Sequence, residues 1–272
     1  MKTGLVLSGG GMRGVAHIGA IKALEENQIY PSYIAGTSAG AVVGALYAGG
    51  CTWQKMLDFF KTVDLFSVKK YARNKPGFID TSKFYDQLKE YLPDDDFAAL
   101  KTPLYITATN LLDGTLKIFH GGQLIRPVLA SAAVPGFFAP IQIKNGYYID
   151  GGTLNTFPVD LIKMYCDKIV GVYVNPFEKV KIEDLKHAHN ILERAYHIKL
   201  ANESLSKFDD CNLLISPKGL ENFGMFSMKN IDAIFQLGYE STLDALENHH
   251  SLNKSISPEE FELMNGFSLD YS

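Results

Sequence analysis

The sequence has few of the residues that hold small secreted or metal-binding proteins together. Its 272 residues include only three cysteines, Cys51, Cys166 and Cys211, which are odd in number and far apart. They form no CxxC pair, so the sequence indicates neither a disulfide framework nor a zinc knuckle. The histidines are not spaced as metal ligands either, because His187 and His189 fall on different faces of a helix. We therefore expect no metal site.

Long hydrophobic runs and an excess of basic charge are also missing. The weakly polar stretch 39–50 is too short and too glycine-rich to span a bilayer, and the apolar start at 4–7 is too short for a signal peptide. The 26 basic and 30 acidic residues give a net charge of −4, whereas nucleic-acid-binding proteins normally carry a basic excess. We expect a cytoplasmic protein that has no transmembrane segment and no nucleic-acid partner.

The composition is that of a globular α/β protein, with 46% hydrophobic and 21% charged residues. Hydrophobic periodicity predicts strands at 4–7, 33–36, 104–109, 116–119, 139–143, 147–149, 168–175 and 212–216. It predicts helices at 14–27, 39–47, 82–91, 124–131, 182–207, 230–248 and over about ten residues after an N-cap at Thr52. The alternation of strands and helices indicates a layered α/β sheet. No linker separates two cores, so a single domain over residues 1–272 is predicted.

A glycine-rich turn between the first predicted strand and helix is the first candidate site. In Gly9-Gly10-Gly11-Met12-Arg13-Gly14 the glycines let backbone N–H groups approach a ligand, and the following helix dipole favours an anion there. The spacing also satisfies G-x-G-x-x-G, but a dinucleotide site would have an acidic residue at the end of the second strand. That strand ends in Gly36-Thr37 instead, so we expect no cofactor.

Ser38 is the second candidate, in the pentapeptide Gly36-Thr37-Ser38-Ala39-Gly40. A G-x-S-x-G motif between a strand and a helix places the serine hydroxyl on a sharp turn, where it can attack a carbonyl. A serine in such a match is more often only a turn residue or an N-cap. Here the glycine turn lies 24 to 29 residues upstream and can supply N–H groups to the developing oxyanion. The two turns together favour a nucleophilic serine.

Asp150 is the best candidate for the base that a serine nucleophile needs. It ends a predicted strand and precedes Gly151-Gly152, which clear space beside the carboxylate. Because Asp-Gly is also a common turn pair, a purely structural role stays open on the residues alone. His17 lies on the apolar face of the first helix, which favours a core position, whereas His120 ends a strand and is an alternative base.

Three motifs occur in the order and spacing found in the patatin-like phospholipases, and the sequence resembles that family over residues 3 to 175. The motifs are the stretch from Ser8 to Gly14, the pentapeptide around Ser38, and Asp150-Gly151-Gly152; the stretch 131–135 also looks like one that the family carries. The resemblance implies a three-layer α/β/α sandwich with a mostly parallel central sheet. The last hundred residues, for which we expect a helical part, carry no motif of this kind.

The resemblance also implies roles for the motif residues. Ser38 resembles the family's nucleophile and Asp150 its base, in a dyad without histidine. Gly9, Gly10, Gly11 and Arg13 resemble the oxyanion element, in which Arg13 either fixes the loop, stabilises the anion or only pairs with a carboxylate. The expected reaction is hydrolysis of an acyl ester of a phospholipid or lysophospholipid through an acyl-enzyme, with peripheral membrane contact. A transacylase using the same site and a non-catalytic lipid-binding protein are the alternatives.

Two apolar segments are candidate contacts for the acyl chain. One contains Phe137 and Phe138, shortly before Asp150, and the other contains Met225 and Phe226. Flexible methionine and aromatic side chains suit adaptable contact with lipid. Plain core packing is the alternative for both segments.

Overall fold

The computed structural model describes residues 1–63, 82–176, 180–225 and 230–251. Its centre is an eight-stranded sheet in which pairing runs in the order β5-β6-β3-β2-β1-β7-β8, with β4 paired to β3. The neighbouring strands β3, β2, β1, β7 and β8 pair in parallel. The pairs β3–β4, β3–β6 and β5–β6 are antiparallel. The strands are β1 (Thr3–Leu7), β2 (Tyr33–Gly36), β3 (Leu104–Asn110), β4 (Leu116–Phe119), β5 (Ile141–Ile143), β6 (Gly146–Asp150), β7 (Lys168–Val172) and β8 (Leu213–Ile215).

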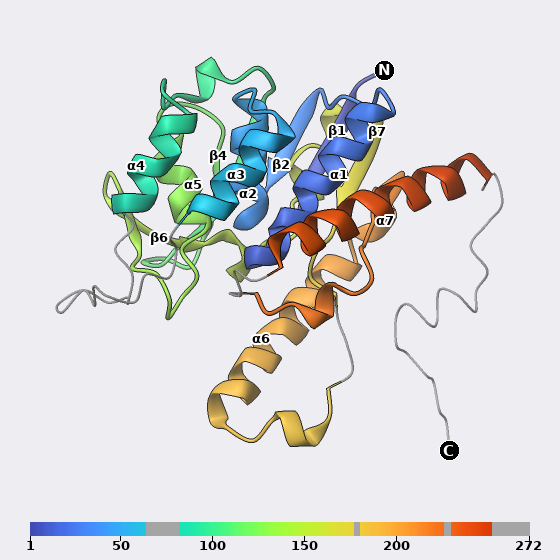
Figure 1. The fold of residues 1–272 in the computed structure, drawn as a ribbon. Coiled ribbons are helices and arrows are strands. Elements are labelled where there is room, and N and C mark those ends of the chain that lie inside the picture. Colours follow the sequence, from blue (N-terminus) through green and yellow to red (C-terminus); the bar gives the residue numbers. More distant parts are fainter. Residues whose placement is uncertain (64–81, 177–179, 226–229, 252–272) are drawn as a thin grey trace.

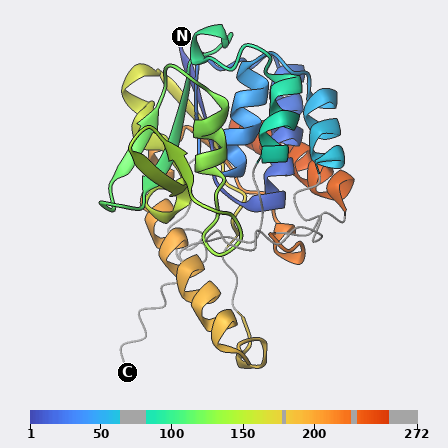
Figure 2. The same ribbon diagram turned by 90° about the vertical axis from the view of Figure 1, so that its left-hand side faces the viewer.

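Helices lie against the sheet and give the molecule its layers (Figures 1 and 2). The α-helices are α1 (Val15–Glu26), α2 (Ala39–Ala48), α3 (Trp53–Thr62), α4 (Ser82–Tyr91), α5 (Ile125–Ser131), α6 (Ala188–Leu205) and α7 (Ile231–Ser251). The first five and α7 gather on one side, and α6 extends away from the body of the molecule (Figures 1 and 2). The predicted fold class, a mostly parallel sheet within an α/β/α sandwich, is confirmed.

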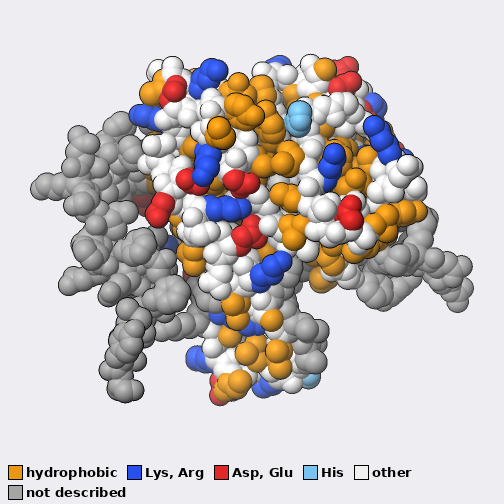
Figure 3. Space-filling view, turned by 180° about the vertical axis from the view of Figure 1, so that it is seen from behind, with side chains coloured by type: hydrophobic (Ala, Val, Ile, Leu, Met, Phe, Trp, Pro, Cys, Tyr) orange, Lys and Arg blue, Asp and Glu red, His pale blue; other side chains and the backbone are white. Residues whose placement is uncertain are grey.

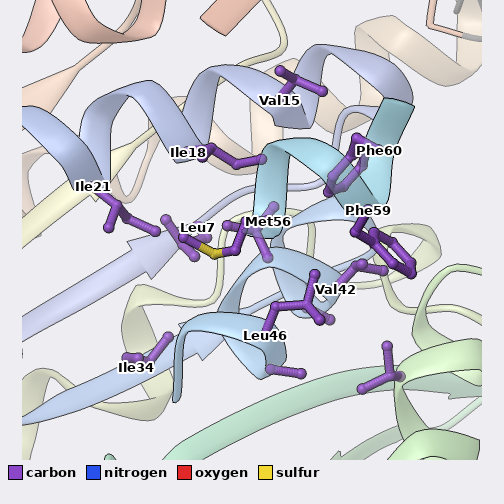
Figure 4. Close-up of a cluster of buried hydrophobic side chains, with 14 of the residues drawn as sticks. Leu7, Val15, Ile18, Ile21, Ile34, Val42, Leu46, Met56, Phe59 and Phe60 are labelled. Carbon is purple, nitrogen blue, oxygen red and sulfur yellow. The ribbon is translucent and has the colours of Figure 1, made fainter. Parts of the chain in front are cut away.

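Two hydrophobic clusters fill the two faces of the sheet. The larger one joins strand residues such as Leu7 and Ile34 to the inner sides of α1, α2 and α3 (Figure 4). The smaller one contains Val6 and Ala35 on the opposite face, packed against Phe157 and the short 3₁₀ helices that follow it. Successive strand residues therefore point to opposite faces, and both faces are apolar because both are covered.

The element bounds agree with the sequence-based prediction except at the edges of the site and in the C-terminal part. Thr52 caps α3 as predicted, with its hydroxyl accepting a hydrogen bond from Lys55 N at 3.4 Å. The strand predicted at 168–175 ends at Val172: Tyr173 N still bonds to Ile215 O of β8, but Val174 N turns to the Ser8 hydroxyl. The helix predicted at 182–207 is α6, preceded by a separate 3₁₀ turn at Ile182–Asp184.

The surface seen from behind carries charged side chains of both signs, interspersed with hydrophobic ones (Figure 3). Hydrophobic side chains also gather on the part that projects at the bottom of this view (Figure 3). In α6, Ile191 and Ile198 are exposed. Across the ranges that the structure describes, no helix combines the length and the apolar character needed to traverse a bilayer.

Candidate active site

The pairing of β3 explains how residues 38 and 150 meet. β2 pairs with positions 104–106 of β3, β6 with positions 108–110, and β4 with positions 106–109. Because β4 shares positions with both of the others, it occupies one edge of β3, and β2 and β6 must share the other. They lie there end to end, one parallel and one antiparallel to β3, with their carboxyl ends facing each other. The side chains of Thr37 and Thr107 mark the junction, with their Oγ1 atoms 2.7 Å apart.

Ser38 and Asp150 form a direct hydrogen bond at this junction. Ser38 Oγ donates to Asp150 Oδ2 at 2.6 Å, and the backbone N–H of Gly152 donates to Asp150 Oδ1 at 2.7 Å. Both side chains are buried, at 6% and 4% exposure. Burial raises the pKa of Asp150 to about 6, against the lowering effect of the two hydrogen bonds. The carboxylate is thus a stronger base than an exposed aspartate and is still ionised at neutral pH.

Ser38 sits on a strained turn between β2 and α2. Its φ of 55° and ψ of −122° are unusual for a residue with a Cβ. The turn is held by Ser131, whose Oγ accepts a hydrogen bond from Ser38 N at 2.8 Å. A Cβ at Gly40 would collide with the carbonyl oxygen of Leu7, so only glycine fits the close approach of α2 to β1. Ser38 takes the N-cap position of α2 without a side-chain capping bond, and its hydroxyl points to Asp150 instead.

The glycine turn lies beside Ser38, and its backbone N–H groups differ in whether they have a hydrogen-bond acceptor. A Cβ at Gly9 would lie 3.3 Å from that of Ser38, but the Gly9 N–H already donates to Thr156 O at 3.0 Å. Gly10 and Gly11 have backbone N–H groups with no acceptor among the described residues, and Gly11 has a φ of 57°. The N–H of Ala39, which follows Ser38, has no acceptor there either. The sequence analysis did not identify Ala39 as a candidate oxyanion donor, although the residue that follows the serine of a G-x-S-x-G turn commonly provides such an N–H group.

Arg13 does not line the cavity at Ser38. Its Nε donates to the carbonyl oxygen of Phe223 at 2.7 Å, and its side chain lines a second cavity together with Asn175, Arg194 and His197. The contact with Phe223 favours the first of the three roles considered for Arg13, in which it fixes the glycine turn. That turn is also tied to the same segment by the bond from Met12 N to Met225 O at 2.7 Å.

An apolar cavity of about 510 Å³, which includes space open to solvent, begins at Ser38. Apart from Ser38, its described lining residues are glycine or apolar, among them Val42, Phe59, Phe60, Phe84, Phe138 and Met225. The structure brings Phe138 and Met225 to this cavity, whereas Phe137 is 40% exposed and does not line it. Phe226 lies outside the described residues. The aromatic residues of α3 and α4 were not selected from the sequence.

The histidines considered as alternative bases lie elsewhere. His17 is buried, as its place on the apolar face of α1 suggests, and its Nε2 lies 2.8 Å from Ser8 O. Burial lowers the pKa of His17 to about 4, so the ring is neutral. His120 is exposed and stacks on Tyr105. Among side chains that the structure describes, no histidine hydrogen-bonds to Ser38 or Asp150.

Comparison with known proteins adds a family to this geometry. The family model for patatin-like phospholipases matches residues 5–162. The human "Patatin-like phospholipase domain-containing protein 6" is 26% identical over 87% of this chain and 20% of its own length. "Lysophospholipase NTE1" of Mycosarcoma maydis is 24% identical over 96% of this chain and 16% of its own. An uncharacterized NTE family protein of Mycobacterium bovis is 33% identical over 65% of this chain. The chain spans from 16% to 50% of the length of these relatives.

Solved structures show the same fold at low sequence identity. VipD from Legionella pneumophila superposes with a TM-score of 0.53 and 15% identity, over 91% of this chain and 67% of VipD. The type III effector protein ExoU gives a TM-score of 0.51 and 17% identity, over 91% of this chain and 53% of ExoU. These likenesses concern the arrangement of the sheet and helices.

Proposed function

This chain belongs to the patatin-like phospholipase family, and from that premise we propose that it is a lipid acyl hydrolase with Ser38 as nucleophile and Asp150 as base. The observation that carries the proposal is the 2.6 Å hydrogen bond between their side chains. It lies at an apolar cavity that Gly11 also lines, next to a glycine turn in which the N–H groups of Gly10 and Gly11 have no acceptor among the described residues. A nucleophile, a base and oxyanion donors in one place are the requirements of acyl transfer.

The first half of the proposed reaction acylates Ser38. As Ser38 Oγ attacks the ester carbonyl, its proton passes to Asp150 Oδ2, and the carbonyl electron pair moves onto the oxygen. The N–H groups of Gly10 and Gly11 donate to this oxyanion. When the tetrahedral intermediate collapses, the bond to the alcohol oxygen breaks and that oxygen takes the proton from Asp150. The products are an acyl-enzyme on Ser38 and a free alcohol, which is a lysophospholipid when the substrate is a phospholipid and a glycerophosphodiester when it is a lysophospholipid.

The second half releases the fatty acid. Water attacks the acyl-enzyme carbonyl and gives its proton to Asp150, and collapse of the second intermediate returns that proton to Ser38 Oγ. The raised pKa of Asp150, about 6, suits a group that must first accept and then donate a proton near neutral pH. The apolar walls around Val42, Phe59 and Phe84 suit an acyl chain, because each buried methylene contributes about 0.8 kcal/mol. Phospholipid and lysophospholipid are the proposed substrates.

Product analysis with a matched variant tests this function. The wild-type protein should release free fatty acid from a mixed phospholipid and lysophospholipid extract, as followed by mass spectrometry, and a fluorophosphonate should label Ser38. The Ser38→Ala variant should lose at least about a thousandfold in kcat/KM, because the nucleophile is gone, and should unfold at nearly the same temperature. Ser204→Ala is the control, since Ser204 is also buried but its hydroxyl bonds to Leu200 O and Tyr173 instead of to Asp150.

Each alternative gives a different result. Persistent hydrolysis by the Ser38→Ala variant would contradict the assignment of the nucleophile. Acyl transfer to added glycerol or lysolipid in place of fatty acid release would indicate a transacylase. A protein that binds the extract but neither turns it over nor reacts with the fluorophosphonate would be a lipid-binding member of the family.

A further inference from the structure

The glycine turn is held by hydrogen bonds to its carbonyl groups from residues other than Ser38. The carbonyl oxygen of Gly9 accepts from Asn175 Nδ2 at 2.7 Å and from Ser8 Oγ at 2.9 Å. The carbonyl oxygen of Ser8 lies 2.8 Å from His17 Nε2. The Ser8 hydroxyl also accepts from Val174 N at 3.0 Å, so it is fixed in turn. These bonds determine how the peptide planes of the turn are oriented.

The orientation matters because a trans peptide couples its two polar groups. The C=O of Gly9 and the N–H of Gly10 belong to one planar unit and point in opposite directions. Asn175 and Ser8 hold the carbonyl on one side, so the Gly10 N–H must point to the other, where it has no acceptor among the described residues. Both neighbours of Gly10 adjoin the site, because Gly9 lies against Ser38 and Gly11 lines the cavity. The bonds to the Gly9 carbonyl therefore fix the direction of the Gly10 N–H in a turn whose neighbouring residues adjoin the proposed nucleophile.

We propose that Asn175 is a positioning residue that holds the Gly9–Gly10 peptide so that the Gly10 N–H faces the oxyanion. This inference rests on the proposed function, and it concerns a residue beyond the 5–162 range that the family model matches. Asn175 follows β7, and the chain before it is anchored by Tyr173 N to Ile215 O and by Val174 N to Ser8 Oγ. A Cβ at Gly10 would lie 2.5 Å from Val174 Cγ2, so residues 174–175 pack directly against the peptide that they orient.

The chemistry of the side chain makes the proposal testable. An asparagine amide can donate to the Gly9 carbonyl, whereas the carboxylate of an aspartate has the same shape and can only accept. Asn175→Asp would therefore place two acceptors face to face and disfavour the present peptide orientation. Asn175→Ala removes one of the two donors to the Gly9 carbonyl and leaves Ser8 Oγ, so its effect should be smaller.

The experiment compares these two variants with wild type on a monomeric short-chain ester. Asn175→Asp should lower kcat by about 10- to 100-fold, at or below the loss in kcat that follows removal of one oxyanion donor. Asn175→Ala should lower kcat by roughly threefold to tenfold. KM should stay within about twofold, because an oxyanion donor acts in the transition state rather than on the bound ester. The affinity for an aliphatic trifluoromethyl ketone, whose adduct with a serine carries an oxyanion, should fall in parallel with kcat.

Asn27→Asp is the matched control. Asn27 Nδ2 also donates to a backbone carbonyl, that of Ala23 at 2.8 Å, at the end of α1 away from the glycine turn. It should lower the melting temperature without changing kcat or the ketone affinity. Should Asn175→Asp fold poorly, the ketone affinity of Asn175→Ala decides the question.

The results separate this inference from the proposed function. An Asn175→Ala variant with wild-type kcat and ketone affinity would overturn the positioning role alone, as would a rise in KM with unchanged kcat. A wild-type protein that is inert towards ester and fluorophosphonate would overturn the proposed function and this inference with it.

Discussion

Two neighbouring turns, residues 8–14 and 36–40, join parallel strands to helices in the same way but contribute different chemical groups to the proposed site. The first connects β1 to α1 through a short 3₁₀ turn; its Gly11 lines the cavity, and the N–H groups of Gly10 and Gly11 have no acceptor among the described residues. The second connects β2 to α2, and its Ser38 hydroxyl donates to Asp150. β1 and β2 pair in parallel, with Gly4 opposite Tyr33 and Leu7 opposite Gly36. The carboxyl ends of the two strands therefore lie side by side. The same local construction thus supplies both the proposed nucleophile and the proposed oxyanion donors.

The turns differ in which residue has a positive φ and in which contacts stabilise that conformation. Gly11, with a φ of 57°, adopts it without steric penalty. Ser38 has almost the same φ, 55°, and a residue with a Cβ is strained there by about 1–3 kcal/mol. The bond from Ser38 N to Ser131 Oγ and the absence of a Cβ at Gly40 offset this strain. A turn that offers amides can therefore be built from glycine alone, whereas a turn that offers a side chain depends on its surroundings.

The largest effect is expected when the serine turn loses its base and the glycine turn is left intact. Asp150→Asn should lower kcat by about 10²- to 10⁴-fold, because general-base catalysis is lost while the oxyanion donors remain. Steady-state kinetics on a soluble ester would measure this loss. In wild type, kcat/KM should fall as the pH is lowered through about 6, where Asp150 gains a proton. A histidine base would instead leave the Asp150→Asn variant substantially active.

The same substitution should make the protein more stable. Because burial raises the folded-state pKa of Asp150 from 3.8 to about 6, its stabilising contribution is complete below about pH 4 and is lost as the pH rises through 6. Asp150→Asn removes a buried charge at neutral pH, so its gain in unfolding free energy should grow between pH 4 and 6 to at most on the order of 3 kcal/mol. Thermal unfolding at pH 4, 6 and 8 would show it, and a pH-independent difference would contradict the raised pKa.

A second substitution breaks the glycine turn and spares the serine. In Gly11→Ala the new Cβ would collide with the carbonyl oxygen of Met225 at a φ of 57°, so the turn must move and its N–H groups leave the oxyanion position. We expect kcat to fall by about 10²-fold, the effect of one lost oxyanion donor. Gly114→Ala is the control, because Gly114 has a φ of 69° but no atom within 4 Å of an added Cβ. Equal kinetic losses in both variants would mean that strain, and not displacement of the turn, is responsible.

The contrast between the turns also shows what the sequence could predict. Local signals predicted the two turns and most strands and helices, because glycine spacing and hydrophobic periodicity are properties of short segments; the end of β7 and the start of α6 were the exceptions. The sequence could nominate Ser38 and Asp150 but could not show that β2 and β6 share one edge of β3, since that register depends on contacts between distant segments. The meeting of the two side chains across 112 positions is a result of that register.

Residues that act through backbone contacts were harder to find. Asn175 follows a buried strand and has no motif around it, and its amide is informative only once its bond to Gly9 O is known. Phe59 and Phe84 lie on helices whose periodicity indicates an apolar face, but periodicity does not distinguish a face that packs in a core from one that lines a cavity. Ser131 lay in a stretch that resembles the family, yet its contact with Ser38 N was not predictable from that resemblance.

Among Asp150→Asn, Gly11→Ala and Ser131→Ala, the last is expected to have the smallest effect on kcat. Ser131 is fully buried, and its Oγ accepts a hydrogen bond from Ser38 N. Two residues later, Ala133 O accepts a hydrogen bond from Asp150 N, so residues 131–133 contact both proposed catalytic residues. Ser131→Ala leaves the Ser38 N–H buried without its acceptor, which costs about 1–3 kcal/mol of stability. We expect kcat to fall by roughly tenfold with little change in KM, because the strained turn can relax away from Asp150. Ser204→Ala, in an equally buried position on α6, should leave kcat unchanged; a wild-type kcat for Ser131→Ala would show that the strain at Ser38 is borne by Gly36, Gly40 and the sheet without this hydrogen bond.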